Sequence, residues 1–192
     1  VTGVLFNLSE TDATPAMQRL VEKVLPLLSE HNDNIFMNPY FFERVKYLYD
    51  RKGSLGFDRE QEMVLDNIYR RFVNNGISLD EAGQARMREI NRELSSLEYE
   101  FGNRLLAENN AFADRFGVTV SEYAAEMASC SDRARREELF KAYSSRGDHG
   151  DRNDTKELVL DIMRLRIEKS ALLGYDTPAD QILSDKMAHD AA

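Results

Sequence analysis

The sequence predicts an all-α protein with about seven to eight helices. Helix start signals recur along the chain, and apolar residues follow them at intervals of three and four. Only residues 116–120 form a short run typical of a β-strand. No repeat of fixed period and no low-complexity linker divides the 192 residues. We therefore expect residues 1–192 to form a single helical region, although two small domains also fit this length.

Helix starts are predicted where a side chain can accept hydrogen bonds from the free N–H groups of a first turn. Ser78 with Glu81, and Asp154 with Glu157, have the spacing of a capping box. Pro26 lies inside the first helical pattern, so we expect a kink or a break just before it. The expected starts are Asp12 and Thr14, Asn38, Asp58, Ser78, Ser121, Ser131, Asp154 and Thr177.

The longest predicted helix follows Ser78 and carries an apolar seam typical of a coiled-coil-like packing edge. Gly76 and Gly174 are expected to end helices in the left-handed conformation, and residues 147–153 are expected to form a polar loop. The seam consists of Met87, Ile90, Leu94, Leu97, Phe101 and Leu105.

Charge and composition exclude several classes of function. The chain carries 25 Lys and Arg against 34 Asp and Glu, a net charge of −9, and the two signs are interleaved. This argues against binding to nucleic acid or to an anionic membrane, because such proteins present a basic stripe. No apolar run approaches the roughly 20 residues that cross a bilayer. A cytoplasmic protein is expected. The periplasm stays open as the alternative, because the chain begins at Val1 without Met and is expected to be cut from a longer protein.

The sequence lacks the histidine spacing of a zinc peptidase. Such enzymes carry HExxH, which places two histidines on one helical face with a glutamate as general base. The three histidines, His31, His149 and His189, are far apart, and we interpret them as surface or capping residues. Cys130 precedes a helix start, a position where a thiol can be reactive, but no base is near in sequence, so a bystander thiol is the favoured interpretation. We therefore predict no catalytic, cofactor-binding or metal-binding residue in this chain.

Three further patterns have ordinary explanations. Residues 146–148 spell Arg-Gly-Asp, the integrin-binding tripeptide, but in a helix-exit loop we interpret them as a helix stop. Residues 148–151 contain two aspartates and a histidine without the spacing of a calcium loop, so a cation site is the weaker alternative. The aromatic cluster between Tyr40 and Tyr49 is expected to pack its helix against neighbours rather than to form a ligand platform.

Several segments resemble the thimet-oligopeptidase-type zinc metallopeptidases, closest to the bacterial peptidyl-dipeptidase and oligopeptidase A branch. They follow the family's order and together cover nearly the whole chain. They are residues 4–8 (VLFNL), 26–35 (PLLSEHNDNI), 88–97 (REINRELSSL) continuing through 101–102 to 109–112 (NNAF), 136–137, 142–148 (AYSSRGD), 153–154, 165–175 (LRIEKSALLGY) and 179–180.

The resemblance implies a fold of many helices in two halves that flank a channel, with the zinc-binding helix downstream of the matched region. It implies that this chain is the N-terminal helical part of the channel wall, inactive alone. The parent enzyme would use zinc and release C-terminal dipeptides from short peptides. Its partners would be those peptides and the missing catalytic half. The alternative is a non-catalytic helical interaction module. The segment at residues 112–121 is shorter than the resemblance implies, which suggests a loop that is deleted there or missing from the given sequence.

Overall fold

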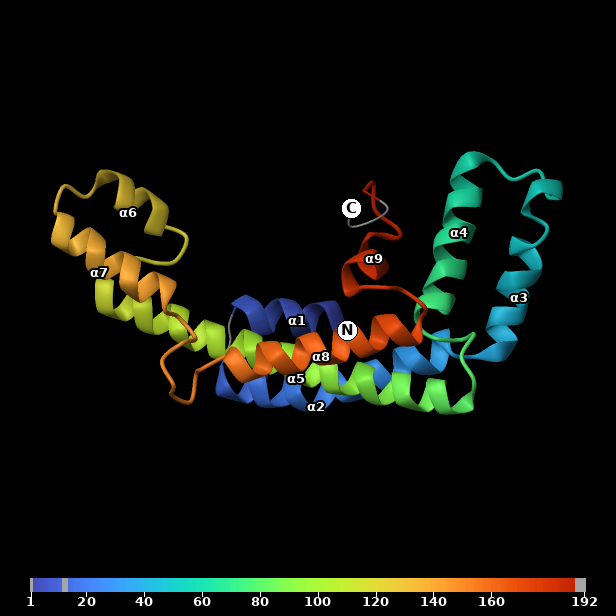
Figure 1. The fold of residues 1–192 in the computed structure, drawn as a ribbon, viewed down its shortest axis with the longest axis horizontal. Coiled ribbons are helices and arrows are strands. Elements are labelled where there is room, and N and C mark those ends of the chain that lie inside the picture. Colours follow the sequence, from blue (N-terminus) through green and yellow to red (C-terminus); the bar gives the residue numbers. More distant parts are fainter. Residues whose placement is uncertain (1, 12–13, 189–192) are drawn as a thin grey trace. The chain divides into compact units, whose positions relative to one another are not determined.

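The computed structural model describes residues 2–11 and 14–188, which form helices joined by turns, without a strand among them. The all-α prediction is therefore confirmed (Figure 1). The helices are α1 (Thr2–Thr11), α2 (Pro15–Phe36), α3 (Pro39–Tyr49), the 3₁₀ turn η1 (Lys52–Ser54), α4 (Arg59–Asn74), α5 (Glu81–Phe116), α6 (Tyr123–Ser129), α7 (Arg133–Ser144), α8 (Lys156–Leu172) and α9 (Pro178–Leu183).

The described residues divide into two compact units. Residues up to 96 and from 164 onward form the first unit, and residues 97–163 form the second. Helices α5 and α8 each contribute to both units. That both units belong to one helical region of a larger peptidase remains a proposal.

Each unit has its own apolar core. The first unit packs α1 against α2, and α3 beside α4 as a helical hairpin (Figure 1). Its buried apolar side chains are Val21, Met37, Leu65, Phe72, Met87, Ile90, Leu94 and Leu165. The second unit pairs α6 with α7, and its buried apolar side chains are Phe112, Val118, Leu139, Leu158 and Ile162.

Only the first half of the predicted apolar seam of α5 is buried. Met87, Ile90 and Leu94 are buried, whereas Leu97, Phe101 and Leu105 are half-buried. The change falls at residue 96, where the first unit ends along the helix. The seam therefore serves the packing of the first unit up to that residue.

Four predicted helix starts are confirmed by their hydrogen bonds. Thr14, Asn38 and Thr177 each accept a backbone N–H of the following first turn, with proline as the next residue. Asp58 forms a complete capping box with Gln61, with bonds of 2.9 and 3.1 Å. Asp12, the other predicted capping residue near the first start, lies outside the described residues.

Two predicted caps are wrong by one or two residues. Helix α5 begins after Asp80 rather than Ser78, because the Asp80 carboxylate accepts the Gly83 N–H at 2.8 Å. Helix α7 begins after Asp132 rather than Ser131, because Asp132 accepts the Ala134 N–H at 2.9 Å. In both places an aspartate closer to the first turn accepts those N–H groups.

The predicted start at Ser121 and the predicted strand at residues 116–120 are also wrong. Helix α5 continues to Phe116, and Gly117 then turns the chain with φ of 65°. Thr119 and Glu122 form reciprocal hydrogen bonds of 3.0 and 3.3 Å with each other's backbone N–H groups. These bonds hold a turn at residues 119–122, and α6 begins directly after it at Tyr123, with Glu122 as an N-cap that makes no side-chain capping bond.

Proline and glycine positions have mixed outcomes. Helix α2 is not broken at Pro26 but continues from Pro15 to Phe36. Gly76 and Gly174 have φ of 88° and 81°, which confirms both as left-handed stops.

Helix α1 was not predicted, because residues 2–11 contain no recognisable cap and the helix lies against α2.

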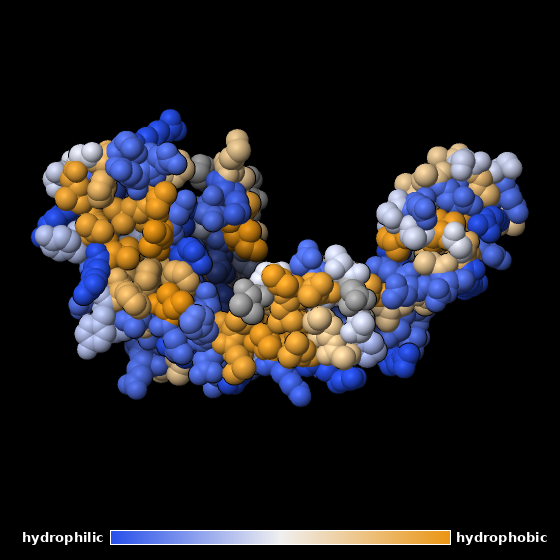
Figure 2. All heavy atoms as spheres, turned by 180° about the vertical axis from the view of Figure 1, so that it is seen from behind, coloured by the Kyte–Doolittle hydropathy of each residue, from blue (hydrophilic) through white to orange (hydrophobic). Residues whose placement is uncertain are grey.

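Apolar surface remains exposed on the α3–α4 hairpin, which lies on the left in Figure 2. The exposed large apolar side chains of this hairpin and its connection are Tyr40, Phe41, Tyr47, Leu48, Leu55, Met63, Val64 and Ile68. Among the described residues, none of the helices combines the length and apolar character that crossing a membrane requires.

Candidate functional site

The two described histidines lie in different units. His31 is exposed on α2 in the first unit, whereas His149 follows α7 in the second. His149 Nε2 lies 3.3 Å from Oε2 of Glu108. His189 lies outside the described residues. Within residues 2–11 and 14–188, no three His, Cys, Asp or Glu side chains come together as a possible metal site.

Cys130 lies between α6 and α7 and is half-buried. Its Sγ is 3.6 Å from the backbone carbonyl oxygen of Asp132. The interpretation of Cys130 as a bystander thiol stays a prediction.

The Arg-Gly-Asp tripeptide forms the turn that ends α7. Gly147 is buried with φ of 72°, and its N–H donates to Oε2 of Glu108 at 3.3 Å. The Arg146 guanidinium lies 3.8 Å from the ring centroid of Tyr143. Asp148 is exposed and pairs with Lys156. The prediction of a helix stop is confirmed, because α7 ends at Ser144 and Gly147 is in the left-handed conformation.

A buried carboxylate, Glu108, organises the loop after α7. Its side chain is only 8% exposed on α5. Oε1 accepts a hydrogen bond from Asn153 Nδ2 at 3.0 Å, while Oε2 faces Gly147 and His149. A second carboxylate, Asp154, accepts the backbone N–H groups of Gly150 and Lys156, and these bonds lower its pKa.

The capping box predicted for Asp154 and Glu157 is wrong, because Asp154 accepts other backbone N–H groups. Helix α8 begins at Lys156, and Asp154 accepts N–H groups from both the loop and the helix start. Glu108 was not predicted as a site residue, although the sequence contains a signal for it. Glu108 lies three residues after Leu105 and four before Phe112, so it is a charged residue on an apolar stripe.

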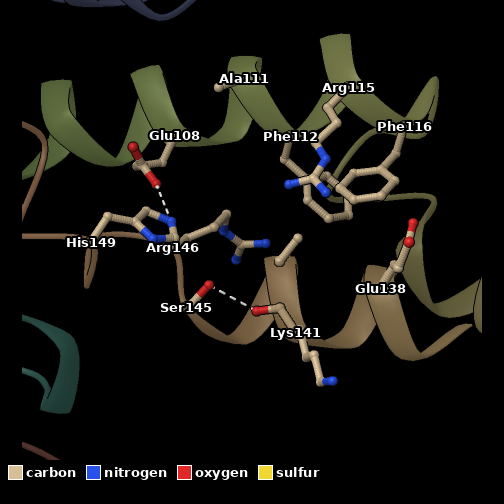
Figure 3. Close-up of a pocket in the computed structure, with 11 residues that line it drawn as sticks. Glu108, Ala111, Phe112, Arg115, Phe116, Glu138, Lys141, Ser145, Arg146 and His149 are labelled. Carbon is tan, nitrogen blue, oxygen red and sulfur yellow. Dashed lines mark hydrogen bonds and ion pairs between the residues drawn. The ribbon is translucent and has the colours of Figure 1, made fainter. Parts of the chain in front are cut away.

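A cavity of about 320 Å³ opens beside this loop, between α5 and α7 in the second unit. Figure 3 shows Arg115 reaching from α5 and Arg146 from the loop after α7 into the same space. The cavity is lined by Glu108, Ala111, Phe112, Arg115, Phe116, Glu138, Lys141, Ala142, Ser145, Arg146 and His149.

In the first unit, a buried carboxylate joins three helices. Asp33 of α2 is 2% exposed and accepts a hydrogen bond from Asn91 Nδ2 of α5 at 2.8 Å. Lys169 of α8 donates to Oδ1 of the same amide at 2.7 Å. Burial raises the pKa of Asp33, although Asn91, Arg88 and Lys169 act in the opposite direction.

The aromatic cluster on α3 packs its helix as predicted, but only in part. The Tyr49 ring stacks on Tyr69 of α4 at 3.8 Å, and Phe42 lies 5.7 Å from Phe72. These contacts confirm the packing interpretation for the inward side chains. Tyr40 and Tyr47 are 78% and 56% exposed, so they take little part in that packing.

Part of the chain matches a known family of peptidases. Residues 126–192, which include α7, the Arg146 loop and α8, match peptidase family M3. The chain is 30% identical over 220 residues to dipeptidyl carboxypeptidase of Escherichia coli, a match covering 98% of the chain. It is 25% identical over 219 residues to oligopeptidase A of Haemophilus influenzae, covering 96% of the chain. The chain is therefore related to peptidase family M3.

The family M3 match covers only part of the related enzymes. The chain spans about a third of their length, 32% of dipeptidyl carboxypeptidase and 32% of oligopeptidase A. Family M3 peptidases use zinc, whereas the 192 residues contain no HExxH segment. The residues present therefore do not fit a zinc centre of this type, and no catalytic step is assigned to them.

Proposed function

We propose that this chain is a non-catalytic helical part of a zinc-dependent peptidase that releases C-terminal dipeptides from short peptides. The observation that carries the proposal is the match to dipeptidyl carboxypeptidase, which runs through 98% of the chain but only 32% of that enzyme. A match of this extent supports a shared helical framework rather than a single shared motif.

In this proposal, residues 1–192 correspond to the N-terminal part of the channel wall, and zinc is held by a catalytic half outside the chain. The exposed apolar side chains of the α3–α4 hairpin support this arrangement, because apolar patches of this kind mark surfaces that another part of a protein can cover. Short peptides and the catalytic half are the proposed partners. The cytoplasm, with the periplasm as alternative, is the proposed compartment.

The shortened segment near residues 112–121 fits the same relationship. The match to dipeptidyl carboxypeptidase extends over 220 residues, more than the 192 of this chain, so the enzyme has additional residues within the matched stretch. In this chain α5 is joined to α6 by the short turn at residues 117–122. A loop deleted at this turn remains our proposal for part of the difference.

The gene and the full protein test the proposal. The reading frame should continue beyond Ala192 into an HExxH segment, and the full protein should release dipeptides from an N-terminally blocked tetrapeptide. Chelation should abolish that release, and added zinc should restore it. A stop codon directly after Ala192 would contradict the proposal and favour the alternative, a free-standing helical interaction module.

A further inference from the structure

Helices α1 and α2 leave large apolar side chains exposed on the face seen in Figure 2, at the centre of the view. Leu20 and Leu27 of α2 are 47% and 63% exposed, and Val24 between them is half-buried. Their spacing of four and three residues places these three side chains on one face of the helix. Val4 and Leu8 of α1 are 65% and 42% exposed, again four residues apart. Side chains at this spacing are typical of a surface that another helix covers, and we call these five residues the α1–α2 surface.

The charge of the chain favours a second copy as the molecule that covers this surface. Residues 1–9 and 24–29 contain no charged side chain, whereas the whole chain has a net charge of −9. Two copies therefore repel each other over most of their surface, and this repulsion is weakest where such uncharged segments meet. A membrane is a poorer occupant, because residues 1–30 carry two Lys and Arg against four Asp and Glu and present no basic cluster.

Charges of opposite sign lie at the two ends of the α2 part of this surface. Arg19 directly precedes Leu20 at one end, and Glu30 follows Leu27 by three residues at the other. Both charged side chains are exposed, and within the described residues neither of them has an ion-pair partner. The edge of the apolar stripe thus presents one positive and one negative group that are available to another molecule.

An antiparallel pair of α2 helices would bring these charges together. With a two-fold axis at the midpoint between Arg19 and Glu30, the arginine of each copy lies opposite the glutamate of the other. The same arrangement brings Leu20 of one copy near Leu27 of the other, so that apolar side chains meet at the centre of the contact. A parallel pair would instead place like charges side by side, which is unfavourable.

We propose that the α1–α2 surface binds a second copy of this chain through an antiparallel pair of α2 helices. The α1 and α2 helices of both copies then form a four-helix contact whose apolar side chains face inward. The residues that form the contact all belong to the first unit. The proposal is therefore independent of the peptidase assignment, and its failure would leave that assignment unchanged.

The first experiment measures the molecular mass of the 192-residue chain by sedimentation equilibrium over a range of concentrations. The parent chain should form a dimer that dissociates on dilution. Leu27→Asp should weaken the dimer at least about tenfold, because it places a charge in an apolar contact. Met63→Asp introduces the same charge at a side chain of α4 that is 55% exposed, and this matched control should dimerise as the parent does.

The second experiment exchanges the two charges. Arg19→Glu and Glu30→Arg should each weaken the dimer, because each sets like charges opposite one another across the two-fold axis. The double variant restores opposite charges and should return to within about threefold of the parent dissociation constant. A residue that acted only through the fold of its own chain would not give this recovery. Circular dichroism of each variant checks that the helices are retained.

Three outcomes would overturn the proposal. The parent chain could remain a monomer at concentrations up to about 1 mM. Leu27→Asp and Met63→Asp could weaken the dimer equally, which would place the contact elsewhere. The double charge variant could stay as weak as the single variants, which would exclude the antiparallel pairing of α2.

Discussion

Asn91 Nδ2 donates a hydrogen bond of 2.8 Å to Oδ1 of Asp33, a residue that is almost fully buried. The carbonyl end of the same amide accepts Lys169 Nζ at 2.7 Å. One side chain of α5 thereby connects α2 and α8 and compensates part of the cost of burying a carboxylate. The first unit depends on this polar contact within an otherwise apolar interior.

The first prediction concerns this amide. Asn91→Ala leaves the buried Asp33 without its donor, so we expect the free energy of unfolding to fall by about 1–3 kcal/mol. Ser96→Ala, which removes an exposed hydroxyl from the same helix, is the control and should change stability by less than about 0.5 kcal/mol. Urea unfolding monitored by circular dichroism measures both. Equal losses in the two variants would contradict the role given to Asn91.

The second prediction follows from the raised pKa of Asp33. The folded state holds the proton more tightly than the unfolded state, so the stabilising effect is present below the unfolded pKa of about 3.9 and is lost as pH rises through the higher folded pKa. Asp33→Asn cannot ionise and can still accept the Asn91 hydrogen bond. Its stability relative to the parent chain should therefore increase between acidic and neutral pH. Parallel pH profiles for the two proteins would contradict this linkage.

The third prediction separates backbone strain from steric contact in the Arg146 loop. Gly147 and Gly150 have nearly the same φ, 72° and 66°. Alanine at either position should therefore lower the free energy of unfolding by about 1–2 kcal/mol, because it must adopt the left-handed conformation. At Gly147 a Cβ would also lie 2.7 Å from Thr155 Oγ1, whereas at Gly150 it would meet nothing within 4 Å. Gly147→Ala should therefore destabilise the chain by at least about 1 kcal/mol more than Gly150→Ala, as measured by urea unfolding. Similar losses would exclude the steric contact.

The fourth prediction tests the two sides of the aromatic cluster. Phe72 is buried against Phe36 and Phe42, so Phe72→Ala should lower the free energy of unfolding by about 3–5 kcal/mol. Tyr40→Ala removes a ring that is 78% exposed and should change it by less than about 0.5 kcal/mol. Thermal unfolding of the two variants measures the difference. A large loss at Tyr40 would show that this ring is covered in solution.

Local signals predicted much of the helical pattern. Asn38, Asp58 and Thr177 cap helices as expected, because proline or a partner glutamine strengthens each cap within its own segment. Ser78 failed as a cap because Asp80 lies nearer to the first turn and accepts its N–H group. Helix α1 could not be predicted, since residues 2–11 offer no local start signal and the helix packs against α2.

The cavity in the second unit was beyond prediction for a different reason. Glu108 and Arg146 are 38 positions apart, and their meeting depends on how the loop after α7 returns to α5. The Arg-Gly-Asp spelling was correctly interpreted as a helix stop, but nothing in the sequence showed that the arginine stacks on Tyr143. Contacts across such a distance come from tertiary packing rather than from periodicity.

We propose that this chain is a helical part of a family M3 peptidase whose zinc site lies outside the 192 residues. The most direct test incubates the purified 192-residue chain with zinc and an N-terminally blocked tetrapeptide, and follows dipeptide release by mass spectrometry. We predict no release above the level seen without protein, because the chain contains no HExxH segment. Zinc-dependent release that a chelator abolishes would contradict the account.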